Sequence, residues 1–166
     1  MNYKYANDDD IHSKGSHELQ SFNYVISSTE KVNAGTGVVY DIDLGNINNI
    51  HNEYLVEVLD LSIDGKVLNT AGYLILTAEN FAEDGFFCRN KLSANECIIS
   101  AINVNEQVLY GVGGTKFKAK GFRMNKRIRF NMRKFDLDLA VSGTDINVGG
   151  DSEWLLTLKM TPICPC

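Results

Sequence analysis

The chain has 166 residues, which is enough for one domain with its own hydrophobic core. Hydrophobic residues make up 44% of it and aromatic residues 10%, a composition typical of globular rather than disordered proteins. No run of about 18 consecutive apolar residues occurs, so we expect no transmembrane helix.

The formal net charge of −5 hides an uneven distribution along the chain. Residues 1–87 carry 14 acidic and 4 basic side chains, whereas residues 88–166 carry 7 acidic and 12 basic ones. This division predicts a subunit with one acidic and one basic surface, a property that matters for association with partners.

The first 19 residues are polar, include the acidic run Asp8–Asp10 and show no hydrophobic period. They predict a mobile N-terminal arm. The arm lacks the apolar core of a secretion signal, so a cytoplasmic location is expected. We assign residues 20–163 to one domain and residues 164–166 to a short tail.

Strand patterns follow one another from residue 21 onwards. Apolar alternation or short apolar runs, bounded by turn residues, predict strands at 21–30, 38–44, 53–63, 72–77, 96–104, 107–112 and 153–161. In the strand at 53–63, apolar residues on both faces predict that other parts of the protein cover both faces, at least in part. Only residues 78–87 would allow a turn of helix. The alternation at 137–141 predicts a further strand segment in which the side chains of Leu137, Leu139 and Val141 point into the core.

About eight strands and almost no helix define the fold class. Both prolines, Pro162 and Pro165, lie after the last predicted strand, so no strand is interrupted by one. The pattern predicts an all-β protein, an antiparallel β-sandwich, and favours a single jelly roll over an immunoglobulin-like arrangement.

A basic stretch at residues 116–134 holds nine of the sixteen lysines and arginines. Its cations alternate with apolar residues such as Phe117, Ile128 and Phe130, the period-two pattern of half-buried strands. The cations that this pattern directs outward are Lys116, Lys118, Lys120, Arg127, Arg129 and Arg133.

Three interpretations of these cations are open. They could bind nucleic acid by neutralising phosphates, although the inward phenylalanines would not be available for base stacking. They could form an ordinary solvated strand face. They could also dock an acidic neighbouring subunit, which is the interpretation that we favour.

No catalytic or metal-binding motif stands out. The three histidines, His12, His17 and His51, lie near no recognisable nucleophile, and the glycine loop at 111–115 departs from the phosphate-binding template. We predict a protein that is not an enzyme and has no cofactor. Cys88 and Cys97 are expected to form a reduced buried pair, and the terminal Cys164 and Cys166 lack the second half of a metal site.

Two aspartate pairs, Asp41 with Asp43 and Asp136 with Asp138, have the spacing of carboxylates on one strand face. Such pairs can serve glycoside hydrolysis or bind calcium. They are more often part of a solvated face, and Asp136 and Asp138 have arginine and lysine neighbours.

The stretch RIRFNMRKFDLDLAV, followed after a loop by WLLTLKMTPI, resembles the closing strands of single jelly-roll capsid proteins of large icosahedral DNA viruses. These are the penton and minor capsid proteins. The resemblance covers mainly residues 116–163, and the strand count extends it over 20–163. The resemblance lies in the pattern of strands and alternating side chains, without a diagnostic motif.

The resemblance implies a non-enzymatic capsid component, located in the virion after assembly in the host cytoplasm. Its partners would be copies of itself and other capsid proteins, including acidic neighbouring surfaces, with nucleic acid as a further candidate. Arg127, Arg129 and Arg133 are the expected contact residues. The alternative is a soluble β-sandwich module that binds carbohydrate or nucleic acid, although Trp154, the single tryptophan, has a core position.

Overall fold

The structure is a computed structural model that describes residues 20–32, 37–44, 53–64, 73–82, 91–103, 109–110, 115–120, 126–141 and 153–163. The expected N-terminal arm, the three histidines, Cys88 and the tail with Cys164 and Cys166 lie outside these residues.

Nine strands and one short 3-10 turn make up the regular structure of the described residues. They are β1 (Phe22–Ser27), η1 (Ser28–Glu30), β2 (Val39–Leu44), β3 (Glu53–Asp64), β4 (Tyr73–Glu79), β5 (Glu96–Asn103), β6 (Leu109–Tyr110), β7 (Lys116–Lys120), β8 (Lys126–Lys134) and β9 (Glu153–Pro162). The helical turn allowed at 78–87 does not form in its described part, because β4 continues to Glu79 and residues 80–82 are irregular.

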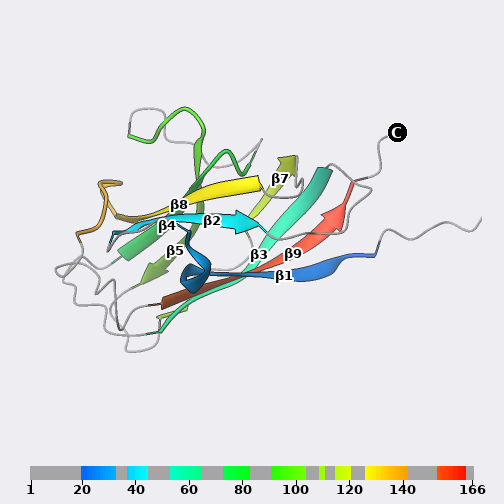
Figure 1. Ribbon diagram of the computed structural model, residues 1–166, viewed down its shortest axis with the longest axis horizontal. Helices are drawn as coiled ribbons and strands as arrows, with labels where there is room; N and C mark the ends of the chain where they lie inside the picture. Colours follow the sequence, from blue (N-terminus) through cyan, green and yellow to red (C-terminus); the bar gives the residue numbers. More distant parts are fainter. Residues whose placement is uncertain are drawn as a thin grey trace, which may run out of the picture.

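The strands form two antiparallel sheets that pack face to face (Figure 1). The β1 sheet has the order β1-β9-β3-β6, with β7 also paired to β3, and the β8 sheet has the order β2-β8-β4-β5. β9 pairs along one edge of β3. β6 and β7 both pair along the other edge, so together they occupy one strand position in the sheet. The order β1-β9-β3-β7 against β2-β8-β4-β5 is that of a jelly roll, so the predicted fold class is confirmed.

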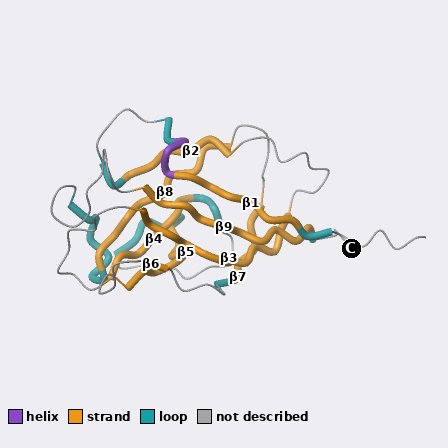
Figure 2. The backbone as a smooth tube through the Cα atoms, turned by 90° about the horizontal axis from the view of Figure 1, so that it is seen from below, coloured by secondary structure: helices purple, strands orange, loops and turns teal. Residues whose placement is uncertain are grey.

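This topology places segments from opposite ends of the chain side by side. β9 lies between β1 and β3, and β8 lies between β2 and β4 (Figure 2). Each late strand therefore pairs with two early ones, which brings the basic second half of the chain next to the acidic first half.

Period-two alternation builds the core as the sequence predicts. In β8, Ile128, Phe130 and Met132 are fully buried, and in β9 every second residue from Trp154 to Met160 is buried. Inward residues of both sheets meet in one hydrophobic cluster. The predicted core position of Trp154 is confirmed.

Aromatic side chains link the two sheets across the core. The Trp154 ring on β9 contacts Tyr40 on β2 edge-on at a centroid distance of 5.3 Å, and it contacts Phe130 on β8 at 5.5 Å. Phe81, just after β4, contacts Phe130 at 5.9 Å and Phe117 on β7 at 5.3 Å. Each such pair adds about 0.5–1.5 kcal/mol beyond the area that it buries.

A β-bulge in β3 corrects one prediction. The pairing with β9 shifts register between Val58 and Asp60, so Leu59 is the extra residue. The shift changes the alternation, and Leu61 and Ile63 point into the same core as Val56. The prediction of cover on both sides of this strand is wrong, because the apolar residues after the bulge face the core while Leu55 and Leu59 are exposed.

The prediction for residues 137–141 is also wrong. Leu139 and Val141 are exposed, and Ala140 is the buried residue. The chain turns sharply after β8, with Leu137 in the left-handed conformation at φ 68°, and returns so that Leu139 pairs with Arg133 through an isolated bridge. The turn inverts the expected alternation.

Across the described part of the chain, helices with the length and hydropathy needed to cross a membrane are absent.

Candidate interaction surface on the outer face of β8

The outer face of β8 carries two bidentate ion pairs with β2. Asp43 lies opposite Arg127 and Asp41 lies opposite Arg129 in the antiparallel register. Arg127 donates from Nε and Nη2 to the Asp43 carboxylate at 2.8 and 3.1 Å. Arg129 makes the same fork with Asp41 at 2.8 and 3.2 Å. We call these four residues the charge ladder.

The ladder is preorganised by its own electrostatics. The hydrogen bond from Arg129 lowers the pKa of Asp41, and the bond from Arg127 lowers that of Asp43. The guanidinium pKa values of Arg127 and Arg129 rise in return, each chiefly through the hydrogen bond to its aspartate. Two forks side by side hold four charged groups in fixed positions, with both arginines and Asp43 exposed and Asp41 partly buried.

An open hollow of about 330 Å³ lies beside the ladder, lined by Asp41, Glu79, Asn80, Arg127 and Arg129. It forms because β4 ends at Glu79, which is opposite Arg129, so β4 does not continue alongside the first residues of β8. Asn80 then takes the left-handed conformation, at φ 56°, and its backbone N–H donates to the Asn95 carbonyl. Every residue that lines the hollow has a polar or charged side chain.

Arg133 lies in a different environment from the ladder arginines. It forms a bidentate pair with Glu96 on β5 at 2.7 and 2.8 Å, and its Nη1 donates to the Leu137 carbonyl at 2.7 Å. Its side chain is 14% exposed and that of Glu96 is 1% exposed. Arg133 therefore joins β8, β5 and the turn after β8 within one subunit.

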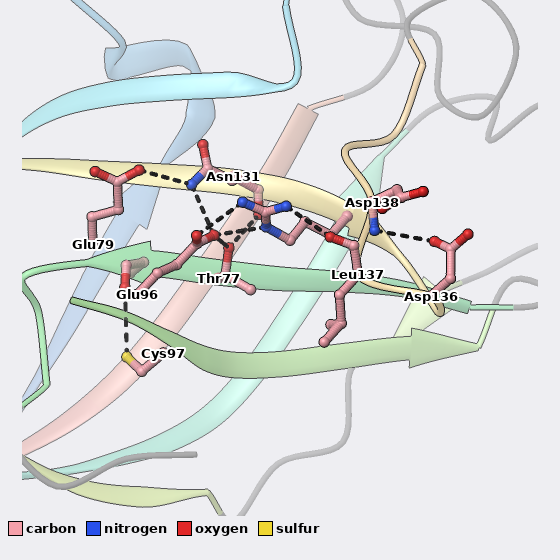
Figure 3. A network of polar contacts seen from close by, with 10 residues as sticks. Thr77, Glu79, Glu96, Cys97, Asn131, Asp136, Leu137 and Asp138 are labelled. Atoms are coloured by element: carbon pink, nitrogen blue, oxygen red, sulfur yellow. Dashed lines mark hydrogen bonds and ion pairs between the residues drawn. The ribbon is translucent and has the colours of Figure 1, made fainter. Parts of the chain in front are cut away.

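Glu96 is the acceptor at the centre of this network (Figure 3). Its Oε1 also accepts hydrogen bonds from the Thr77 hydroxyl and, at 3.0 Å, from the Asn131 amide. Burial alone would raise the pKa of Glu96, but the bonds from Arg133, Thr77 and Asn131 together lower it. The carboxylate is therefore ionised and satisfied inside the protein.

Three lysines of the basic stretch, Lys116, Lys118 and Lys120, lie on the other sheet. β7 pairs with β3, so Lys116 is opposite Glu57, Lys118 opposite Leu55 and Lys120 opposite Glu53. Lys116 Nζ lies 3.5 Å from the Glu57 carboxylate. The Lys120 side chain lies outside what the structure describes.

The structure thus divides the six predicted contact residues among three environments. Arg127 and Arg129 share the ladder, Arg133 is in the Glu96 network, and the lysines are on the β1 sheet. The predicted contact with acidic neighbours stays a prediction. The acidic partners within the subunit were not anticipated, although the alternation of Asp41 and Asp43 around Ile42 marked an outward acidic pair.

The predicted separation into one acidic and one basic surface does not hold where these pairs lie. Asp41, Asp43 and Glu57 come from the acidic half of the chain, and each lies against a cation of the basic half. The interleaved strand order causes this mixing.

The outer face of the β1 sheet exposes apolar side chains. Val25 on β1, Leu155 on β9 and Leu59 on β3 surround Thr157 in the register, and Leu55 lies further along β3. They are 40–53% exposed. We call Val25, Leu55, Leu59 and Leu155 the apolar face.

The second aspartate pair and the described cysteine both have interaction partners within the subunit. Asp136 and Asp138 each have a lysine within 3.7 Å, namely Lys134 and Lys91. Cys97 is a free thiol whose burial raises its pKa to about 11, and its Sγ–H donates to the Ala78 carbonyl. Within the described ranges, no three metal-binding side chains come together.

No protein-family model matches the chain, and no curated protein or solved structure is similar enough to it to suggest a relationship. The resemblance to capsid proteins remains a prediction, and the function is argued from the fold and the two outer faces.

Proposed function

We propose that this protein is a non-enzymatic structural component of an icosahedral virus capsid, a penton or minor capsid protein. It assembles with copies of itself and with other capsid proteins through the outer faces of its sheets and its N-terminal arm. The jelly roll supports the proposal, since viral capsid subunits are one of the classes that use this fold. Fold alone does not specify function, so the surfaces carry the rest.

The observation that carries the proposal is the apolar face. The core is already complete beneath it, with Leu156 and Leu158 fully buried between the sheets, yet Leu155 on the same strand is 46% exposed. Several exposed apolar side chains on one sheet face favour a surface that a partner covers. Lys116, Glu57 and Lys159 form a charged row that crosses the sheet between Leu55 and the other three residues, so the face combines apolar and charged contacts, as protein interfaces do.

The alternative binding module has less support. Trp154 lies in the core and provides no platform for a sugar ring. The ladder arginines face aspartates of their own subunit, so the four described residues of the ladder carry no excess of positive charge for phosphates. Neither carbohydrate nor nucleic acid is favoured by a described feature over a protein partner.

The test replaces two residues of the apolar face, Leu55→Lys together with Leu155→Lys. The wild type is expected to form oligomers by light scattering and electron microscopy, and the variant is expected to lose them because like charges and polar groups replace the apolar contact. Phe135→Lys is the matched control, since Phe135 is 70% exposed but lies in the turn after β8.

Circular dichroism and thermal unfolding establish that each variant is folded. Assembly that is unchanged by the double substitution would contradict the role of the apolar face. A wild-type monomer that binds immobilised oligosaccharide or DNA would instead favour the binding module.

A further inference from the structure

We propose that the charge ladder is a self-complementary docking surface, on which two copies of the chain meet face to face about a two-fold axis that runs parallel to β2 and β8. The acidic neighbour of Arg127 and Arg129 is then Asp43 and Asp41 of a second copy. This inference rests on the proposed assembly function and names its partner and symmetry.

The register of the two strands carries the inference. β2 contributes only carboxylates to the ladder and β8 only guanidinium groups, in two rows, Asp41 with Arg129 and Asp43 with Arg127. The two-fold axis lies between the two facing copies, runs parallel to the strands and passes midway between β2 and β8. Rotation about it places β2 of one copy opposite β8 of the other and keeps each row at the same height along the strands. Each arginine of one copy then faces the aspartate of the same row in the other copy.

Another orientation of the axis fails this condition. A two-fold axis that lies across the strands exchanges the rows but keeps the strand positions, so Asp41 would face Asp43 and Arg127 would face Arg129. Like charges directly opposed across an interface cost several kcal/mol. The ladder therefore selects one symmetry of face-to-face pairing, and a closed two-fold pair of this kind is the commonest arrangement of identical subunits.

The internal ion pairs assist the contact between copies. Each ladder arginine uses Nε and Nη2 for its own aspartate, so further N–H groups of the planar guanidinium remain to reach a second carboxylate. The forks already hold the long side chains in one conformation, which reduces the entropy lost on association. Both arginines are at least half exposed and face solvent from the sheet.

Apolar residues flank the ladder and add contact area. Val32, which lies beside β2 on the side away from β8, donates its backbone N–H to the Asp41 carbonyl and is 49% exposed. Leu139 lies beside Arg133 further along β8 and is 44% exposed. Surface ion pairs contribute little by themselves, so we expect a weak dimer in which charge determines partner and register.

The test uses two complementary variants, Asp41→Arg with Asp43→Arg, and Arg127→Asp with Arg129→Asp. The first has an all-positive ladder and the second an all-negative one. Analytical ultracentrifugation of the wild type is expected to show pairing through the ladder at about 0.05 M salt. This pairing should be lost at about 1 M salt, where the screening length falls to about 3 Å. Each variant alone should bind itself more than about tenfold more weakly, and an equimolar mixture should form a heterodimer.

A neutral variant keeps the inference testable if the reversed ladders do not fold. It combines Asp41→Asn, Asp43→Asn, Arg127→Gln and Arg129→Gln, and is expected to stay folded by circular dichroism and to lose the salt-dependent pairing by ultracentrifugation. The matched control exchanges the ion pair of the other sheet, Glu57→Lys with Lys116→Glu, and should keep the wild-type dimer.

The outcomes separate this inference from the proposed function. A wild type that is monomeric at low salt, or a mixture of the two variants that fails to associate, would overturn the ladder pairing. If larger assemblies persist in the neutral variant but disappear when the apolar face is changed, the assembly function stands and the ladder inference falls.

Discussion

Glu96 illustrates how much a single residue can depend on its neighbours in this fold. Its carboxylate is 1% exposed and accepts hydrogen bonds from three side chains that lie on β4 and β8. A buried charge is tolerated only when it is paired and hydrogen-bonded, and here both conditions are met. The same residue is therefore a sensitive probe of whether the outer part of the β8 sheet forms as described.

We predict that Glu96→Gln lowers the free energy of unfolding by about 3 kcal/mol. The amide removes the negative charge opposite Arg133 and turns N–H donors toward other donors. Chemical denaturation at neutral pH measures the change. Glu57→Gln is the control, because its pair with Lys116 is largely exposed and should contribute less than about 1 kcal/mol. Equal effects of the two substitutions would contradict the described network.

Acid should destabilise the protein through the same group. The pKa of Glu96 is lowered in the folded protein, so its stabilising contribution is fully present above the unfolded value of about 4.3 and is lost as the pH falls through the folded value. Asp41, whose pKa is also lowered, acts in the same direction. Denaturation between about pH 7 and about pH 3 should show a smaller loss for Glu96→Gln than for the wild type. An identical slope would mean that Glu96 does not titrate below its ordinary range.

At the scale of elements, β8 holds the sandwich together on both of its faces. Its inward residues join the aromatic contacts between the sheets, and its outward residues pair with β2 and β5. Its position between β2 and β4 gives it hydrogen-bonded neighbours along both edges. Substitutions that are chemically similar should therefore have very different effects at alternate positions of this strand.

Phe130→Ala is expected to cost about 3–5 kcal/mol of unfolding free energy, because it leaves a cavity beside Trp154 and Phe81. Phe135→Ala, five residues further along, should change the stability by less than about 0.5 kcal/mol, since that ring is 70% exposed. Thermal and chemical unfolding of the two variants provide the comparison. A small effect at Phe130 would contradict its central place in the core.

Elements also show where local pattern stops being informative. The alternation of β8 and β9 predicts their inward faces correctly, because each strand is regular over its whole length. In β3, the extra residue Leu59 changes the alternation, and a bulge has no strong signature in a single sequence. In the turn after β8, the left-handed Leu137 reverses the expected faces, and this conformation is uncommon for leucine.

On the scale of the whole molecule, the jelly roll mixes two halves that differ in charge. Strands of the first half alternate in space with strands of the second, so acidic and basic side chains meet on shared faces. The apolar face lies on the β1 sheet and the charge ladder on the β8 sheet, which are opposite sides of the sandwich. A subunit with two different outer faces can contact two different neighbours, as the proposed assembly requires.

The amino-acid sequence by itself determined the all-β class, the inward faces of regular strands and the outward direction of the basic side chains, because side-chain alternation is a local property of an extended chain. Only the tertiary structure decided which groups those side chains meet. Arg127 and Asp43 are 84 residues apart in the chain, and Arg129 and Asp41 are 88 apart. Such pairs depend on strand order and register, which arise when two sheets bury one common core.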